Sequence, residues 1–210
     1  MPEDLKYIIE SLLFVSETPL TIDQLKGVLE NIDTSVIKSA IEELVAEYGQ
    51  RDGGFVLRQV AGGHQFRTQG RYNEWIKRLV KPSAPRLSKA SLETLAIIAY
   101  NQPIIRSDIE HIRGVDSGGV IRMLMERKLV RVLGRKEIPG RPLIYATTKH
   151  FLEVFELKDL KDLPTPKEIE ELSKSRLEEN PDIETDGEEL PIEQPASDPF
   201  SETDPEEEIE

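Results

Sequence analysis

The residues that could carry catalysis are few, and their spacing forms no recognisable site. The three histidines (His64, His111 and His150) stand far apart in the sequence and at no regular spacing from carboxylates. No serine or lysine lies in a motif that supplies a partner base, so neither a nucleophile nor an acid–base pair is indicated. The chain has no cysteine, which excludes disulfides and thiolate zinc sites. We therefore predict a protein that is not an enzyme and that holds no metal and no cofactor.

One glycine-rich segment, residues 114–119, opens a predicted helix and could in principle cradle an anion. It has neither the spacing nor the lysine of a phosphate-binding loop. A tight turn into a closely packed helix is the simpler interpretation, and no small-molecule substrate is expected.

Charge is segregated along the chain, whose net charge is −13. Residues 165–210 carry 18 acidic and 3 basic side chains, whereas residues 71–150 carry 7 acidic and 16 basic ones, and residues 1–70 carry 11 and 6. No apolar run approaches the ~20 residues that cross a bilayer, and the first residues are acidic, unlike a signal region. We expect a cytoplasmic protein without a membrane partner.

Apolar spacing predicts three helices and a hairpin in the first part of the chain. Five apolar residues at helical spacing indicate the first helix: Leu5, Ile8, Ile9, Leu12 and Leu13. Thr21 and Gln24 have the spacing of a capping box for a second helix, and Thr34 can cap a third. The third helix has this predicted buried stripe: Ile37, Ala40, Ile41, Leu44 and Tyr48. Strands at 55–60 and 65–68 flank a glycine turn, which completes the order of a winged-helix domain.

The same plan recurs at an offset of 84 residues. The matched pairs include Pro19 and Pro103, Leu20 and Ile104, Leu25 and Ile109, Val36 and Val120, Ile37 and Ile121, and Ile41 and Met125. Ser88 is placed to cap the first helix of the second copy, and strands are predicted at 129–133 and 143–147. Two copies are too few for a solenoid, so the repeat indicates a tandem of similar domains.

The predicted fold class is mainly α with small β wings (α+β), with two tandem winged-helix domains and a disordered acidic tail. Winged-helix domain 1 covers residues 1–80, including a linking helix at 71–80. A proline-containing linker follows at 81–87, and winged-helix domain 2 covers 88–164. Residues 165–210 are acidic and proline-punctuated with few aromatic residues, which is typical of a largely disordered tail.

Specific DNA binding is not favoured by either domain. In the third helix of domain 1, the solvent-facing positions include Glu42, Glu43 and Glu47, which would repel phosphates. The third helix of domain 2 begins with Ser117 and two glycines, which cannot make a bidentate base contact. We expect weak, non-specific DNA contact at most. A winged-helix DNA-binding transcription regulator remains the alternative function.

Several segments of the second domain resemble one family. They are residues 87–100 (LSKASLETLAIIAY), 102–104 (QPI), 112–117 (IRGVDS), 134–148 (GRKEIPGRPLIYATT), 151–153 and 160–164. In this order they are similar to the ScpB family (segregation and condensation protein B), and the resemblance extends over residues 5–164. Ile105 stands where the resemblance implies threonine, and Glu156 where it implies glycine. The resemblance therefore does not define the local turn geometry at these two positions.

The resemblance implies a cytoplasmic, nucleoid-associated subunit of the bacterial SMC condensin. Such a protein forms a homodimer through its first domain and binds the kleisin ScpA, which bridges the SMC ATPase heads. The complex condenses and segregates the chromosome during cell division, and ATP hydrolysis belongs to the SMC partner.

Two candidate surfaces follow. The apolar first helix and the hairpin of domain 1 suggest a dimer interface made of Leu5, Ile8, Ile9, Leu12, Phe55 and Leu57. The glycine- and proline-shaped loops of domain 2 suggest a kleisin-binding surface made of Arg113, Val115, Asp116, Ser117, Arg135, Lys136, Glu137, Arg141 and Tyr145. The competing interpretation is that the latter residues only fix the hairpin against its own domain.

Overall fold

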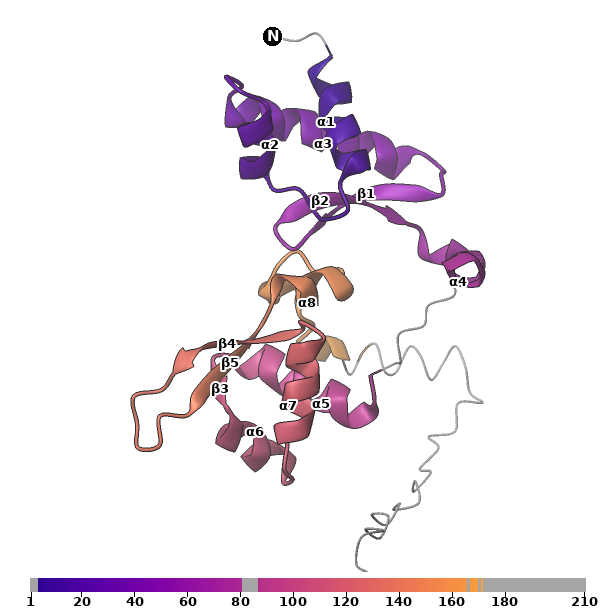
Figure 1. Ribbon diagram of the computed structural model, residues 1–210. Coiled ribbons are helices and arrows are strands. Elements are labelled where there is room, and N and C mark those ends of the chain that lie inside the picture. Colours follow the sequence, from indigo (N-terminus) through magenta and orange to yellow (C-terminus); the bar gives the residue numbers. More distant parts are fainter. Residues whose placement is uncertain (1–3, 81–86, 166, 170, 172–210) are drawn as a thin grey trace, which may run out of the picture. The chain divides into compact units, whose positions relative to one another are not determined.

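The computed structural model in Figure 1 describes residues 4–80, 87–165, 167–169 and 171. The described residues up to Pro164 belong to one compact unit. The described residues are mainly helical, with two small antiparallel sheets. Two hydrophobic cores form within residues 4–164, one in the first half (4–80) and one in the second half (87–164). Most of the predicted linker and nearly all of the acidic tail lie outside the described residues.

The first half follows the predicted order of three helices and a hairpin. Its elements are α1 (Leu5–Val15), α2 (Ile22–Val28), α3 (Thr34–Gln50), β1 (Phe55–Val60), β2 (Gly63–Thr68), the 3-10 turn η1 (Gly70–Tyr72) and α4 (Asn73–Val80). The capping box of α2 is formed between Thr21 and Gln24. The cap predicted for α3 is wrong by one residue, because Asp33 occupies the N-cap position and makes no side-chain capping bond.

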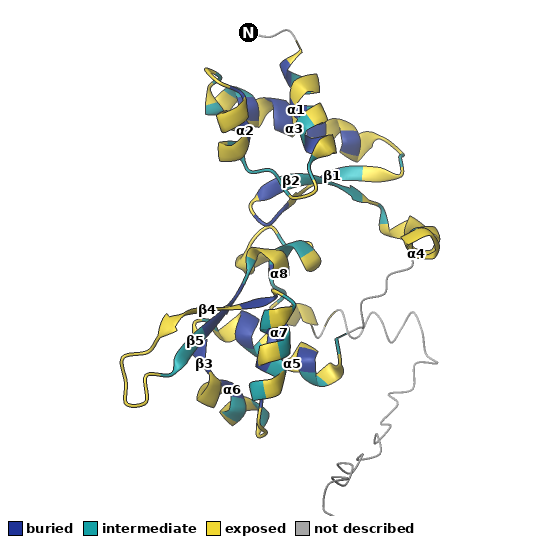
Figure 2. Ribbon diagram, in the orientation of Figure 1, coloured by how far each residue is buried: buried dark blue, intermediate teal, exposed yellow. Residues whose placement is uncertain are grey.

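The core of the first half is organised by α3. The buried stripe of this helix consists of Ile37, Ala40, Ile41, Leu44 and Tyr48, as its helical spacing predicts. Figure 2 shows dark blue, buried stretches recurring along α3 between exposed ones. The stripe packs with Leu5, Ile9 and Leu13 of α1 and with Leu25 of α2. Burying such large aliphatic side chains stabilises a fold by about 1.5–3 kcal/mol each.

The hairpin of the first half turns more tightly than predicted. Val60 pairs directly with Gly63, so the turn consists only of Ala61 and Gly62, whose φ angles are 52° and 76°. Two left-handed residues in succession match the twist of a two-residue hairpin. Leu20 adds an isolated bridge to β2, since its backbone exchanges hydrogen bonds of 2.9 and 2.8 Å with His64.

The second half repeats this plan with one additional strand. Its elements are α5 (Lys89–Asn101), β3 (Ile104–Ile105), α6 (Arg106–Arg113), α7 (Gly118–Glu126), β4 (Val130–Arg135), β5 (Leu143–Thr147), α8 (Lys149–Val154) and the 3-10 turn η2 (Leu160–Asp162). Ser88 caps α5 as predicted, through its hydroxyl and the Ser91 N–H. The sheet order is β3-β5-β4, and Ile104 pairs with Tyr145. Ile104 therefore holds the place that Leu20 holds in the first half, 84 residues earlier.

The two positions that depart from the expected family pattern have different structural roles. Ile105 is the N-cap residue of α6 and supplies no side-chain cap, but it is buried and packs in the second half. Glu156 has a φ of 55°, in the left-handed region that favours glycine. Its carboxylate lies 3.4 Å from the Arg58 guanidinium, and both side chains are largely exposed.

Replacing Glu156 with glycine should stabilise the protein slightly. The left-handed backbone of a residue with a side chain costs roughly 1–2 kcal/mol, and glycine removes this strain. The substitution also loses an exposed ion pair that contributes at most ~1 kcal/mol. The Glu156→Ala variant loses the same ion pair and keeps the strain. We expect the glycine variant to be about 1 kcal/mol more stable than the alanine variant in urea unfolding, and an alanine variant of equal or greater stability would contradict this account.

Candidate protein-binding surfaces

The chemistry-bearing side chains lie in separate elements. His64 is in β2 and partly buried, and the cost of burial lowers the pKa of its imidazole, which favours the uncharged ring. His111 lies on α6, and His150 lies on α8 at 3.3 Å from Glu153. Within the described residues, no group of three or more histidine, cysteine or acidic side chains could hold a metal ion. No helix in that part of the chain is both long and apolar enough to cross a membrane.

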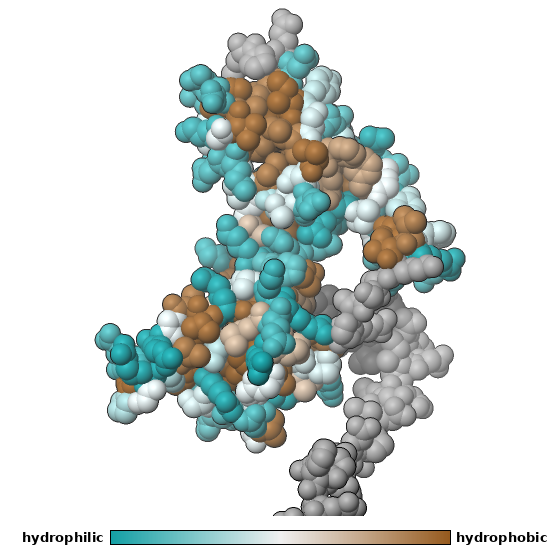
Figure 3. All heavy atoms as spheres, in the orientation of Figure 1, coloured by the Kyte–Doolittle hydropathy of each residue, from teal (hydrophilic) through white to brown (hydrophobic). Residues whose placement is uncertain are grey.

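Helix α1 exposes large apolar side chains as well as burying others. Phe14 and Val15 are 78% and 75% exposed, and Tyr7 and Ile8 are also exposed. Figure 3 shows hydrophobic atoms gathered on the surface of the first half. Exposed apolar groups that lie together on one face commonly mark a protein-binding surface.

The predicted dimer residues divide between this surface and the core. Leu5, Ile9 and Leu57 are buried in the hydrophobic core of their own half. Because a side chain enclosed by its own domain contacts no partner, these three are removed from the candidate surface. The remaining candidates, Ile8, Leu12 and Phe55, are exposed or partly buried. Three further exposed residues of α1 that were not predicted belong to the same surface: Tyr7, Phe14 and Val15.

The composition of α1 contains a signal for the three residues that were not predicted, Tyr7, Phe14 and Val15. Eight of its eleven residues, LKYIIESLLFV, are apolar or aromatic. A helix that packs on one side of a domain needs only one apolar stripe, so the surplus marks a second, unpartnered face.

Three aromatic rings meet beside this face. The ring centroids of Tyr48, Phe55 and Phe66 lie 4.8–5.6 Å from one another, and the Arg51 guanidinium lies 5.9 Å from two of them. The Tyr48 hydroxyl donates a hydrogen bond to Glu10 of α1. We call this site the aromatic hollow: it has a volume of about 300 Å³ and is lined by Glu10, Ser11, Phe14, Tyr48, Phe55 and Phe66.

Replacing Tyr48 with phenylalanine should remove a pH-dependent contribution to stability. The hydrogen bond to Glu10, together with burial, raises the pKa of Tyr48 to about 12. The folded state therefore favours the protonated phenol, and this contribution is complete below pH ~10 and is lost as the pH rises towards 12. We expect Tyr48→Phe to be about 1.5 kcal/mol less stable at pH 7, with the difference shrinking above pH 10.

Urea unfolding of both proteins at several pH values measures this difference. A constant difference across pH 7–12 would show that the hydroxyl does not donate to Glu10 in solution.

The turn between α6 and α7 is held by an ion-pair network. Arg106 pairs with Glu110 at 2.6 Å and also with Asp116. Glu110 accepts the Ser117 N–H at 3.0 Å, and Asp116 accepts the Gly118 N–H at 3.1 Å. The carboxylates thus satisfy N–H groups that the start of α7 leaves free. Backbone and arginine contacts also lower the pKa of Glu110.

The partner-binding candidates in this turn serve mainly the turn itself. Arg113 is largely covered, lies 3.7 Å from Glu93 and donates to the Ser117 hydroxyl at 3.2 Å. Ser117 is fully buried. Only Val115 and Asp116 of this group are exposed, so the glycine-rich segment has the structural role that its spacing indicated.

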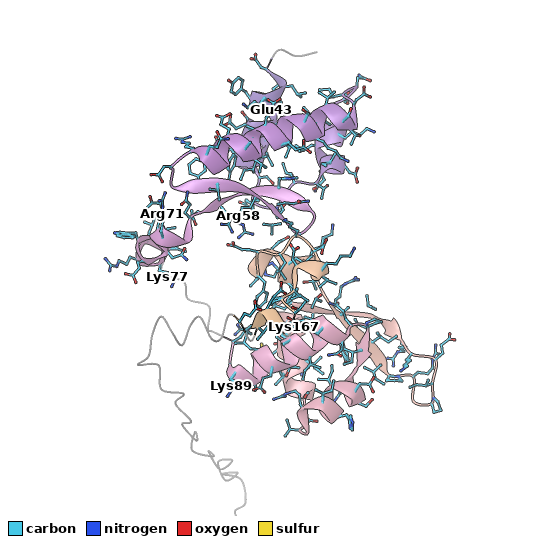
Figure 4. The ribbon with its side chains drawn as sticks, turned by 180° about the vertical axis from the view of Figure 1, so that it is seen from behind. Glu43, Arg58, Arg71, Lys77, Lys89 and Lys167 are labelled. Atoms are coloured by element: carbon cyan, nitrogen blue, oxygen red, sulfur yellow. The ribbon has the colours of Figure 1, made fainter. Side chains whose placement is uncertain are left out.

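The candidates in the β4–β5 hairpin are exposed at its tip, with one exception. Arg135, Lys136, Glu137 and Arg141 all face solvent. The loop is closed by hydrogen bonds from Lys136 N–H to Pro142 at 2.9 Å and from the Arg135 guanidinium to the Arg141 carbonyl at 3.0 Å. Figures 1 and 4 show that this tip and the α6–α7 turn lie apart within the second half, so the structure does not join them in one surface.

Tyr145 is the exception in the hairpin. It is 7% exposed, pairs with Ile104 and Val132 across the sheet, and belongs to the core of the second half. Its role is therefore to fix the hairpin against its own domain, and it is removed from the partner-binding candidates.

Comparison with known proteins identifies the family. Residues 7–166 match the family model described as segregation and condensation complex subunit ScpB. The chain belongs to the ScpB family. Segregation and condensation protein B of Syntrophotalea carbinolica is 48% identical over 171 residues, covering 81% of this chain and 86% of that protein. The Moorella thermoacetica protein of the same name is 44% identical over 171 residues, covering 80% and 85%.

Other ScpB proteins match over different shares of their length. The Myxococcus xanthus protein is 47% identical over 174 residues, which are 83% of this chain and 53% of that protein. Among solved structures, ScpB from Mycobacterium tuberculosis is 31% identical and covers 73% of this chain and 95% of its own, with a TM-score of 0.35. A dimer of an ScpB N-terminal domain complexed with an ScpA peptide is 28% identical over 40% of this chain and all of its own, also with a TM-score of 0.35. Family membership rests on the sequence matches and not on these superpositions.

Proposed function

We propose that this chain is a non-enzymatic subunit of an SMC–ScpA–ScpB complex that binds the kleisin ScpA and supports chromosome condensation and segregation. The observation that carries the proposal is the family match over residues 7–166, with relatives named segregation and condensation protein B. A role in binding agrees with the separate placement of the three histidines and with the exposed apolar and basic surfaces. The protein acts in the cytoplasm at the nucleoid, and its contact with the SMC heads runs through the kleisin.

Both halves act as winged-helix modules that bind protein. In each half, three helices are followed by an antiparallel hairpin, and a residue at the equivalent position adds a further pairing to that sheet. The outer face of α3, where a DNA-reading helix would need bases, exposes Glu42, Glu43 and Glu47. Figure 4 shows Glu43 on this helix. DNA contact is therefore weak and non-specific.

The homodimer forms through the first half. Its surface consists of the exposed residues of α1 and Phe55, because these large apolar side chains face solvent in a single chain. A stable interface buries more than roughly 1,000 Å² in total, and α1 alone offers only part of that area.

The kleisin binds at the hairpin tip of the second half. Four of the side chains between Arg131 and Arg141 are basic and only Glu137 is acidic, and Leu133 and Ile138 are exposed among them. Basic groups interleaved with apolar ones suit an acidic amphipathic segment.

Titration calorimetry with the ScpA kleisin of the same genome tests this surface. The double charge reversal Arg135→Glu with Lys136→Glu should weaken kleisin affinity at least tenfold with unchanged thermal stability. Arg122→Glu is the matched control, because Arg122 is also exposed, lies on α7 of the same half and pairs with Glu126 one turn along the helix. Full affinity in the double variant would place the kleisin site elsewhere, and no binding by the wild-type chain would contradict the proposed function.

A further inference from the structure

Helix α4 is an amphipathic helix that buries none of its own residues. Its apolar side chains recur at helical spacing, at Tyr72 just before the helix and at Trp75, Ile76, Leu79 and Val80 within it. Trp75, Leu79 and Val80 are 63%, 85% and 66% exposed, and Figure 3 shows hydrophobic atoms over this segment. A face of this composition on a short helix is stable only when something covers it.

The helix is attached to the first half at its beginning. The Arg71 guanidinium lies 2.5 Å from Asp52 and donates to the Gly53 carbonyl at 3.2 Å, and the Gln69 N–H donates to Gly54 at 3.0 Å. These contacts fix the start of the segment next to Phe55, which begins β1. The rest of α4 extends from this anchor with its apolar face open.

The aromatic hollow is an apolar recess of the same half that α4 of its own chain leaves unfilled. Its lining comes from α1, α3, β1 and β2 and includes no residue of α4. Phe14 stands at the hollow and is largely exposed. A large aromatic or aliphatic side chain from outside would extend the ring cluster in the geometry that aromatic pairs favour.

The hollow and the helix are complementary in charge and in hydrogen bonding. Glu10 is the one charged residue in the lining of the hollow, whereas the α4 segment carries Arg71, Lys77 and Arg78 against Glu74. Glu10 in the hollow accepts the Tyr48 hydroxyl through one carboxylate oxygen. Its other oxygen offers an acceptor to the indole N–H of a tryptophan, which normally needs a partner when buried.

We propose that in the homodimer each copy places Trp75 and Leu79 of α4 in the aromatic hollow of the other copy. The inference rests on the homodimer proposed above and names the segments that form it. A two-fold axis makes both contacts at once, because one surface of each copy supplies the helix and another the hollow. Burying Trp75 and Phe14 of both copies removes on the order of 600–1,000 Å² of surface from solvent. Together with the rest of the α1 face, this area reaches that of a stable dimer.

We call this reciprocal placement of α4 the helix exchange between copies. Complementation between two variants of the full chain tests it. The arm variant carries Trp75→Glu and Leu79→Glu, and the hollow variant carries Phe14→Glu. All three side chains are exposed in the single chain, so each variant keeps its core, which circular dichroism checks. Sedimentation equilibrium should show that each variant alone dimerises at least 100-fold more weakly. An equimolar mixture should regain much of the dimer, because a heterodimer of the two retains one intact helix–hollow contact.

The control is Ile112→Glu on α6, an exposed apolar residue of the second half that belongs to none of α1, α4 and the hollow. It should leave the dimer dissociation constant unchanged within threefold. Trp75 is the single tryptophan of the chain, so its fluorescence gives a second measurement. Emission from the wild type should shift to the red on dilution to monomer, and the Phe14→Glu variant should show the red-shifted emission at every concentration.

Each other outcome overturns a defined part of the argument. A wild-type chain that stays monomeric at tens of micromolar contradicts the homodimer and the exchange together. Variants that dimerise as tightly as the wild type leave the homodimer standing and overturn the exchange. Weak variants that gain nothing on mixing show that the helix and the hollow do not meet across copies. An equally weak Ile112→Glu variant shows that the effect is not specific to the hollow.

Discussion

Tyr145→Ala should lower the free energy of unfolding of the second half by about 3–5 kcal/mol. The side chain is 7% exposed and packs in the core beside Ile104 and Val132, its neighbours across the sheet. Truncating a buried aromatic residue loses its transfer free energy and leaves a cavity that the surroundings fill incompletely. Hydrogen exchange of the amides in α5 and α7 measures the loss.

Leu133→Ala is the matched control in the same hairpin, since Leu133 is 47% exposed on β4. Its effect should stay within about 0.5 kcal/mol. If Tyr145→Ala preserved exchange protection and weakened kleisin binding, Tyr145 would be a partner contact and its burial in the core would be wrong.

Gly63→Ala should destabilise the first half by about 2–3 kcal/mol. A Cβ at this position would lie 2.8 Å from the carbonyl carbon and oxygen of Leu20 and 2.9 Å from the carbonyl carbon of Pro19. These are backbone atoms held by the paired hydrogen bonds between Leu20 and His64, so they cannot move aside without breaking that bridge. Overpacking of this kind costs about 1–3 kcal/mol, and the loss of the bridge places the effect at the upper end.

Gly54→Ala provides the comparison for this substitution. A Cβ there meets nothing within 4 Å, and the glycine does not have a left-handed backbone. Its effect should stay within about 0.5 kcal/mol. Exchange protection of α1 and α3 reports both variants, and equal effects would mean that the Leu20–His64 bridge is not formed in solution.

The parts of the fold that the sequence predicted are those with one clear apolar period. In α3 the predicted stripe of five residues at helical spacing, from Ile37 to Tyr48, is buried at every position. The repeat at 84 residues also gave the correct equivalence, because Leu25 and Ile109 are both buried, as are Ile37 and Ile121. Local capping was predicted where the side chain itself makes the bond, at Thr21 and Ser88.

Helix α5 shows where periodicity is insufficient. Helical spacing places Leu92 on one face with Leu95 and Ala99, yet Leu92 is 45% exposed, while Thr94 is fully buried. Thr94 satisfies its hydroxyl within the helix by donating to the Ala90 carbonyl at 2.8 Å, so its burial leaves no polar group unpaired. When most positions of a helix are apolar or small, several rotations bury similar areas, and the neighbouring elements select among them.

The sequence by itself determined the family and the order of three helices and a hairpin in both halves, because these depend on residue types and local spacing. Only the tertiary structure decided which apolar and aromatic residues are free to meet a partner. It buried Leu5, Ile9, Leu57 and Tyr145 and exposed Phe14, Trp75 and Leu79. The physical reason is that a leucine or a tyrosine gains similar free energy from any apolar surface, within its own domain or on another chain. Which of the two it contacts depends on the rotation of each helix against residues distant in the sequence.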